Sequence, residues 1–140
     1  MSRFRIIIFA VLFMVPFSNA NADELKSFLL KFTDAKDYPY ELLEENYRAF
    51  IKIEENYLSV GKQELKKLYD AQAKLTESFF IKSFRILSRS DSEFFTTVAY
   101  EYVWKAKIDQ KKMSGVMTVH SILRKIGSGW SIVFEAVSQD

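Results

Sequence analysis

The sequence has no cysteine, one histidine, four glycines and two prolines in its 140 residues. Without thiols the chain forms no disulfide and offers no thiolate as a nucleophile or metal ligand. A single histidine and the lack of a calcium-loop spacing leave no ligand set for a metal, so we expect neither a metal nor a cofactor. The stability of the fold must therefore come from packing.

Neither sign of charge dominates beyond the first 22 residues. The 20 Lys and Arg residues include Arg3 and Arg5, which leaves 18 basic residues against 18 acidic ones from residue 23 onward. Basic and acidic side chains are interspersed along this part, and it has no basic block. We therefore expect no nucleic-acid partner.

The first 22 residues have the three parts of a secretory signal peptide. Arg3 and Arg5 precede an apolar run over residues 6–17, and the small residues Ser18, Ala20 and Ala22 follow it. The run is much shorter than the roughly 20 residues of a membrane-spanning helix, so we expect no permanent membrane anchor. The pattern predicts cleavage near Ala22 and export to the periplasm or the medium.

Residues 23–140 are expected to form one domain that begins with helices. Apolar residues at Leu25, Phe28, Leu29 and Phe32 have the spacing of one helical face. The run 37–39, with its proline, predicts a second, short helix that ends near residues 46–48. A hairpin over 49–60 with its turn at 54–56, and a third helix over about 62–77, follow.

The period of the apolar residues changes from helical to alternating after the third predicted helix. Strands are predicted over 80–87, 94–104, 113–125 and 130–137, and residues 127–129 form a tight turn between the last two. Helices followed by strands indicate an α+β fold. We expect N-terminal helices packed on a strongly curved antiparallel sheet.

The last strands resemble those of a known superfamily. Residues 122–138 contain an apolar strand, the basic pair Arg124 and Lys125, a glycine turn, Trp130 and then Ser138. Together with residues 97–102, this stretch is similar to the nuclear transport factor 2-like, or SnoaL-like, superfamily, which includes ketosteroid isomerase. The resemblance implies a cystatin-like cone with a cavity between helices and sheet, over nearly all of residues 23–140.

The catalytic positions of the ketosteroid isomerase branch do not carry over to this chain. The resemblance puts the base of that branch at Ile53, next to Glu54, and its tyrosine donor at Leu29 or Phe28. It puts the acid at His120. Because two of these three positions are apolar here, that activity is not expected.

His120 is the main candidate for acid–base chemistry, since an imidazole titrates near neutral pH. Strand alternation places it on one face with Thr118, and the resemblance turns this face toward the cavity. Glu54 and Glu101 are the candidate partners that would orient it. The alternative is a structural strand histidine with no catalytic role.

An aromatic strand provides the candidate ligand pocket. Tyr100, Tyr102 and Trp104 alternate on one strand face, and Thr118 and Tyr47 are expected to add polar groups. Rings and hydroxyls in this arrangement suit a small apolar or aromatic ligand. The alternative is that these rings are core residues or a dimer-facing surface.

Three functions stay open at this stage. The leading hypothesis is an exported, non-catalytic binding or accessory protein with an aromatic-lined cavity, working as a homodimer packed through its sheet. The second is a small isomerase- or dehydratase-type enzyme that uses His120 as acid and base. The third is a protein–protein interaction module with an envelope or secretion-machine partner.

Overall fold

The computed structural model describes residues 23–140. Residues 23–30 are helical, which confirms the first predicted helix there, and residues 31–140 form a larger unit; each is described by itself. The predicted signal peptide and its cleavage site lie outside the described residues. Within residues 23–140, no helix is both long and apolar enough to cross a bilayer.

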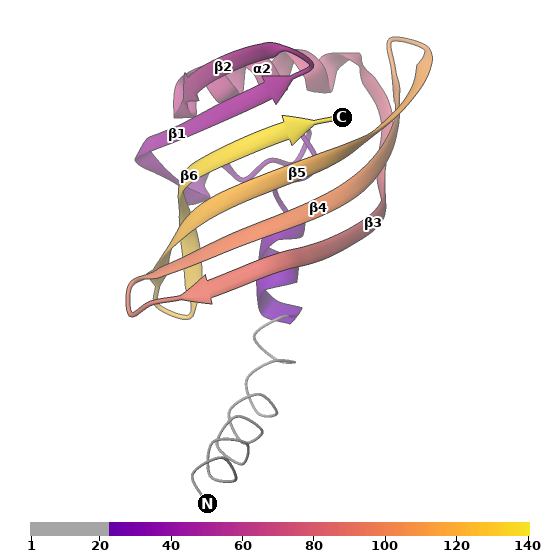
Figure 1. Cartoon of the computed structure of the whole chain (residues 1–140). Coiled ribbons are helices and arrows are strands. Elements are labelled where there is room, and N and C mark those ends of the chain that lie inside the picture. The colour runs from indigo at the N-terminus through magenta and orange to yellow at the C-terminus, as the bar shows by residue number, and fades with distance from the viewer. Residues whose placement is uncertain (1–22) are drawn as a thin grey trace, which may run out of the picture. The chain divides into compact units, whose positions relative to one another are not determined.

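The larger unit is built on one six-stranded sheet (Figure 1). A short 3-10 helix, η1 (Tyr40–Leu42), precedes the strands, and their order across the sheet is β2-β1-β6-β5-β4-β3. The elements that follow η1 are, in chain order, β1 (Leu43–Ile53), β2 (Asn56–Gly61), α2 (Lys62–Leu75), β3 (Thr76–Asp91), β4 (Phe95–Ile108), β5 (Lys111–Ile126) and β6 (Gly129–Gln139).

The mixed α+β class is confirmed, but two details of the prediction are wrong. The second predicted helix is only η1, because the residues after it form β1, which pairs with β2 on one side and β6 on the other. These long-range pairings override the local helical pattern. The sheet is also not purely antiparallel, since β1 and β6 run parallel.

The predicted hairpin and third helix are confirmed. β1 and β2 are joined at Glu54, whose φ of 56° suits a tight turn. At the start of α2 the carboxylate of Glu64 accepts a hydrogen bond from the backbone N–H of Gly61, at 2.6 Å. At its end the hydroxyl of Thr76 donates to the carbonyl of Gln72, at 2.8 Å. Both contacts satisfy backbone groups that a helix leaves unpaired at its ends.

The strands are longer than predicted because the turns between them are short. Asp109 and Gln110 both have positive φ, 49° and 67°, and connect β4 to β5. Gly127, with φ 57°, turns β5 into β6 as predicted. Positive φ at both central residues gives a turn whose twist matches that of the flanking strands.

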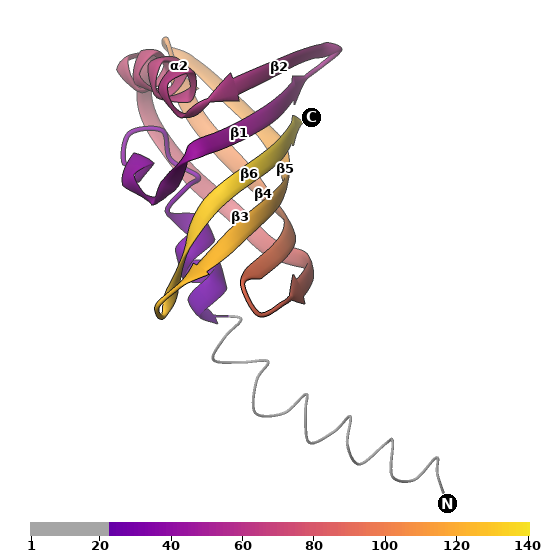
Figure 2. The same cartoon turned by 90° about the vertical axis from the view of Figure 1, so that its left-hand side faces the viewer.

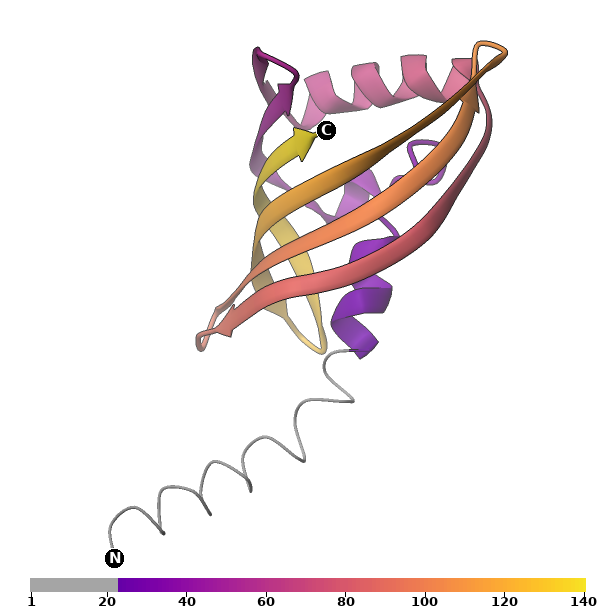
Figure 3. The same ribbon diagram turned by 45° about the vertical axis from the view of Figure 1, so that its right-hand side comes forward.

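The sheet of this unit is strongly curved and has two distinct faces. The inner face of β4 carries Val98, Tyr100, Tyr102 and Trp104, which are all buried. Figures 2 and 3 show the long strands curving and α2 running across one end of the sheet. The alternation predicted for β4 is confirmed, with its aromatic face inward.

A bulge in β6 changes which of its residues face inward. Leu123 of β5 pairs with Ile132, but the preceding Ile122 pairs with Phe134, so Val133 is an extra residue. An extra residue on one strand shifts the alternation beyond it by one position. Glu135 consequently lies opposite Ser121 and is buried, only 4% exposed.

A close contact between β4 and β5 depends on glycine and gives a first test. A Cβ at Gly115 would lie 3.0 Å from the indole of Trp104, whereas at Gly129 its nearest neighbour would be 3.9 Å away. We expect Gly115→Ala to lower the free energy of unfolding by about 1–3 kcal/mol, measured by urea denaturation. Gly129→Ala is the control. Equal stability of the two variants would contradict the packing of Trp104 on Gly115.

Candidate functional site

The larger unit contains a cavity of about 330 Å³, a size typical of small-molecule sites. The segment before β1, helix α2 and all six strands contribute to its wall. Its lining residues are Phe32, Thr33, Asp34, Ala35, Tyr38, Ile51, Ile53, Leu58, Leu68, Tyr69, Gln72, Thr76, Phe79, Tyr102, Trp104, Ile108, Met113, Met117, Val137 and Gln139. Most of these side chains are apolar or aromatic, so the cavity suits a largely apolar ligand.

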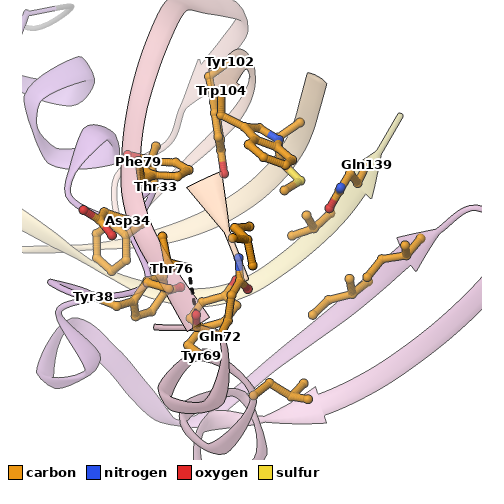
Figure 4. Close-up of a pocket in the computed structure, with 18 of the residues that line it drawn as sticks. Thr33, Asp34, Tyr38, Tyr69, Gln72, Thr76, Phe79, Tyr102, Trp104 and Gln139 are labelled. Carbon is orange, nitrogen blue, oxygen red and sulfur yellow. Dashed lines mark hydrogen bonds between the residues drawn. The ribbon is translucent and has the colours of Figure 1, made fainter. Parts of the chain in front are cut away.

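Two tyrosine hydroxyls provide polar groups in this wall. Tyr102 comes from β4 and is only 6% exposed, and Figure 4 shows its hydroxyl directed toward the middle of the pocket. Tyr69 comes from α2 and lines the same pocket. Within residues 23–140, neither hydroxyl has a hydrogen-bond partner. The indole N–H of Trp104, in the same wall, is buried and also has no partner in the described residues. A buried donor without a partner is costly, so a ligand acceptor at this point would be stabilised.

A buried carboxyl lies behind the pocket and fixes one of its walls. Tyr47 donates a hydrogen bond to Oε1 of Glu135 at 2.7 Å, and Tyr38 donates to the same oxygen at 3.3 Å. Ser121 donates to Oε2 at 3.3 Å. The ring of Tyr38 lines the pocket while its hydroxyl is directed to Glu135, so Tyr38 contributes a surface and not a free donor.

Burial dominates the electrostatics of this cluster. It raises the pKa of Glu135, although the hydroxyls of Tyr47, Tyr38 and Ser121 act in the opposite direction. Burial, and then the nearby Glu135, also raise the pKa of Tyr102 and of Tyr69. Both tyrosines therefore keep their protons at any ordinary pH and act as donors.

Some of the predicted pocket residues lie at the cavity and others lie behind it. Tyr102 and Trp104 line the cavity. Tyr100 stacks against Tyr102, with ring centroids 6.3 Å apart, and Tyr47 bonds Glu135; both are fully buried and neither is among the lining residues. Any effect of these two on a ligand would thus pass through their neighbours.

The expectation that His120 faces the cavity is wrong. His120 is exposed, while its neighbours Val119 and Ser121 are buried, so it lies on the outer face of the sheet. Thr118 alternates with it on that same outer face. The pairing of β5 with β4 and β6 decides the face, and it puts Met117 on the inner side.

The two carboxylates proposed as partners of His120 are also outside the cavity. Glu101 pairs with Thr118 across the strands and forms an ion pair with Arg85 at 3.3 Å. Glu54 is exposed in the β1–β2 turn. Neither is a lining residue of the pocket. The catalytic roles predicted for His120, Glu101 and Glu54 therefore have no common site in this pocket.

The sequence analysis missed Glu135, Tyr38 and Asp34. The available signal for Glu135 was its place as an acidic residue within the apolar stretch 132–137. Such a side chain either lies on the outer face of the sheet or is turned to the inner face by a bulge. Asp34 is half-buried in the pocket wall and accepts a hydrogen bond from the backbone N–H of Lys36 at 3.0 Å. No periodic pattern marks it.

Comparison with known proteins gives a fold. The sequence matches no protein-family model and no curated protein. A conserved protein from Planctomyces limnophilus superimposes with a TM-score of 0.69 at 12% identity, over 86% of this chain and 97% of that one. A ketosteroid isomerase-like protein from Erwinia carotovora atroseptica superimposes with a TM-score of 0.63 at 12% identity, over 86% of this chain and 97% of that one.

A nuclear transport factor 2-like protein of unknown function from Silicibacter pomeroyi gives a TM-score of 0.60 at 11% identity, over 86% of this chain and 93% of that one. Identities this low carry the fold and no particular activity. The chain has the nuclear transport factor 2-like fold, which confirms the resemblance seen in residues 97–102 and 122–138.

The raised pKa of Glu135 predicts a pH-dependent stability. Between about pH 4.5 and its higher folded-state pKa, the folded protein keeps a proton on Glu135 that the unfolded chain has lost. The free energy of unfolding should therefore fall as pH rises through this window. Glu135→Gln should flatten the fall, as measured by urea denaturation at a series of pH values above 4.5.

The matched control is Glu101→Gln, which removes a carboxylate from the outer face of the same sheet. It should keep the wild-type slope above pH 4.5. A Glu135→Gln variant with an unchanged slope would mean that this carboxyl titrates normally.

Proposed function

We propose that this protein is an exported binding protein that holds a small, largely apolar ligand in the cavity beside Tyr102. The observation that carries the proposal is a pocket of about 330 Å³ whose wall includes the hydroxyl of Tyr102 and the buried indole N–H of Trp104, neither of which has a partner in the described residues. Apolar walls supply affinity by removing ligand surface from water, and a few polar groups fix its orientation. Export rests on the sequence of residues 1–22.

An enzyme of the isomerase or dehydratase kind is the second candidate, and one observation favours it. Such a reaction needs a base in the cavity, and Asp34 is the only carboxylate among the lining residues. Tyr102 would then be the matching donor. This version of the hypothesis replaces His120, whose exposed position on the outer face removes it from the pocket.

Native mass spectrometry of residues 23–140, purified from an exporting host, tests ligand binding directly. We expect a small molecule that is lost on denaturation and whose mass defines the ligand. Tyr102→Phe should weaken its binding about threefold to tenfold, because one hydrogen bond is lost while the ring remains. Tyr57→Phe is the control, since Tyr57 is 74% exposed and lies outside the pocket wall.

An equal effect of the two tyrosine variants would place the ligand elsewhere. Chemical conversion of the bound molecule during incubation, such as loss of one water, would favour the enzyme over the binding protein. This conversion should stop in Asp34→Asn.

The outer face of the sheet supports the proposed homodimer. Phe50 of β1 is 52% exposed and contacts Phe134 of β6, with ring centroids 5.6 Å apart. Ile122 of β5 is the cross-strand neighbour of Phe134 and is also exposed. Adjacent apolar residues on three neighbouring strands, exposed on β1 and β5 and half-buried on β6, are typical of a protein interface. The same patch would serve an envelope partner in the interaction-module alternative.

Phe50→Glu tests this interface, since a charge in the middle of an apolar contact must be desolvated without a partner. We expect the wild-type protein to sediment as a dimer in analytical ultracentrifugation and Phe50→Glu as a monomer. Phe94→Glu, at a 62% exposed position between β3 and β4, should leave the dimer intact. If the wild-type protein is a monomer at all concentrations, the homodimer proposal is wrong, and a different protein would be the partner that binds this apolar patch.

A further inference from the structure

The charges around the pocket are uneven. Among the residues that line it there is no Lys, Arg or His, and the one ionisable group besides tyrosine is the carboxylate of Asp34. A second carboxyl, Glu135, is buried directly behind the ring of Tyr38. The wall thus offers an anionic ligand no counter-charge, and its one acidic group is the carboxyl of Asp34.

The hydrogen-bonding groups of the pocket add a second restriction. Tyr38 is engaged with Glu135, and the hydroxyl of Thr76 donates to the carbonyl of Gln72, at 2.8 Å. The donors at the pocket wall that have no partner in the described residues include the neutral hydroxyls of Tyr102 and Tyr69 and the buried indole N–H of Trp104. Neutral donors match an uncharged oxygen acceptor, such as a carbonyl, and do not neutralise a charge.

We infer that the pocket selects uncharged ligands that carry a carbonyl-type oxygen and discriminates against carboxylates and other anions of the same shape. This inference rests on the proposed ligand-binding function and specifies its ligand class. The oxygen lies at Tyr102, and the apolar body lies along Ile51, Met117 and Val137. An anion entering this pocket loses its hydration without gaining a cationic partner.

Three probes that share a naphthalene body test the inference by isothermal titration calorimetry. They are 2-acetylnaphthalene, which is neutral, 2-naphthoate, which is an anion, and 2-naphthamidinium, which is a cation. We expect the ketone to bind, and the carboxylate to bind at least about tenfold more weakly, since tenfold corresponds to 1.4 kcal/mol and an unpaired buried charge costs more than this.

A gain-of-function variant makes the test independent of folding defects. Gln72 is an exposed side chain of α2 at the pocket wall. Gln72→Lys supplies the missing cation and should strengthen 2-naphthoate binding about tenfold relative to binding of the ketone. Gln63→Lys makes the same substitution at an exposed position of the same helix away from the pocket, and it should change neither affinity.

The outcomes separate this inference from the proposed function. Binding of the ketone with a much weaker carboxylate supports both. Comparable binding of ketone and carboxylate, or tightest binding of the amidinium, overturns the selection for uncharged ligands while the pocket stands as a binding site. If none of the three probes binds to the wild-type protein or to Gln72→Lys, the proposed ligand-binding function itself fails.

Discussion

The buried carboxyl of Glu135 is the constraint on which the site depends. Removing a carboxyl from water is tolerated only when hydrogen bonds replace those of the solvent. Here the donors come from three different parts of the chain: Tyr38 before η1, Tyr47 in β1 and Ser121 in β5. One acidic side chain thereby ties the segment before β1 to the sheet. It also holds the ring of Tyr38 in the pocket wall while occupying its hydroxyl.

The bulge at Val133 is the reason that sequence reasoning did not find this carboxyl. Simple alternation from the buried Ile132 would put residues 134 and 136 inside and Glu135 outside. The bulge reverses this order, and it is defined by pairing with β5, which no local pattern of β6 reveals. The prediction that His120 faces the cavity was wrong for a related reason. Its strand was predicted correctly, but both faces of that strand carry apolar residues, so only the register with β4 decides which face is inward.

Features set by local interactions were predicted well. Helix α2 is capped by the carboxylate of Glu64, three residues after Gly61. The alternation of β4 is strong because its aromatic residues share one face. The segment 43–48 was mistaken for helix because its two buried residues, Leu43 and Tyr47, are four positions apart, as on a helix face. In the structure a register shift separates them along β1, where the pairing with β6 is irregular.

The two faces of the sheet carry separable properties. The inner face provides rings, neutral hydroxyls and a buried carboxyl, whereas the outer face carries His120, the ion pair of Glu101 with Arg85, and the apolar patch around Phe50. A change at one face reaches the other only through backbone shifts, because the side chains of adjacent residues point in opposite directions. Interface variants should consequently leave ligand affinity intact unless a partner alters the curvature of the strands. Since all six strands contribute to the wall of the cavity, a change in that curvature is the one physical route by which assembly could regulate binding.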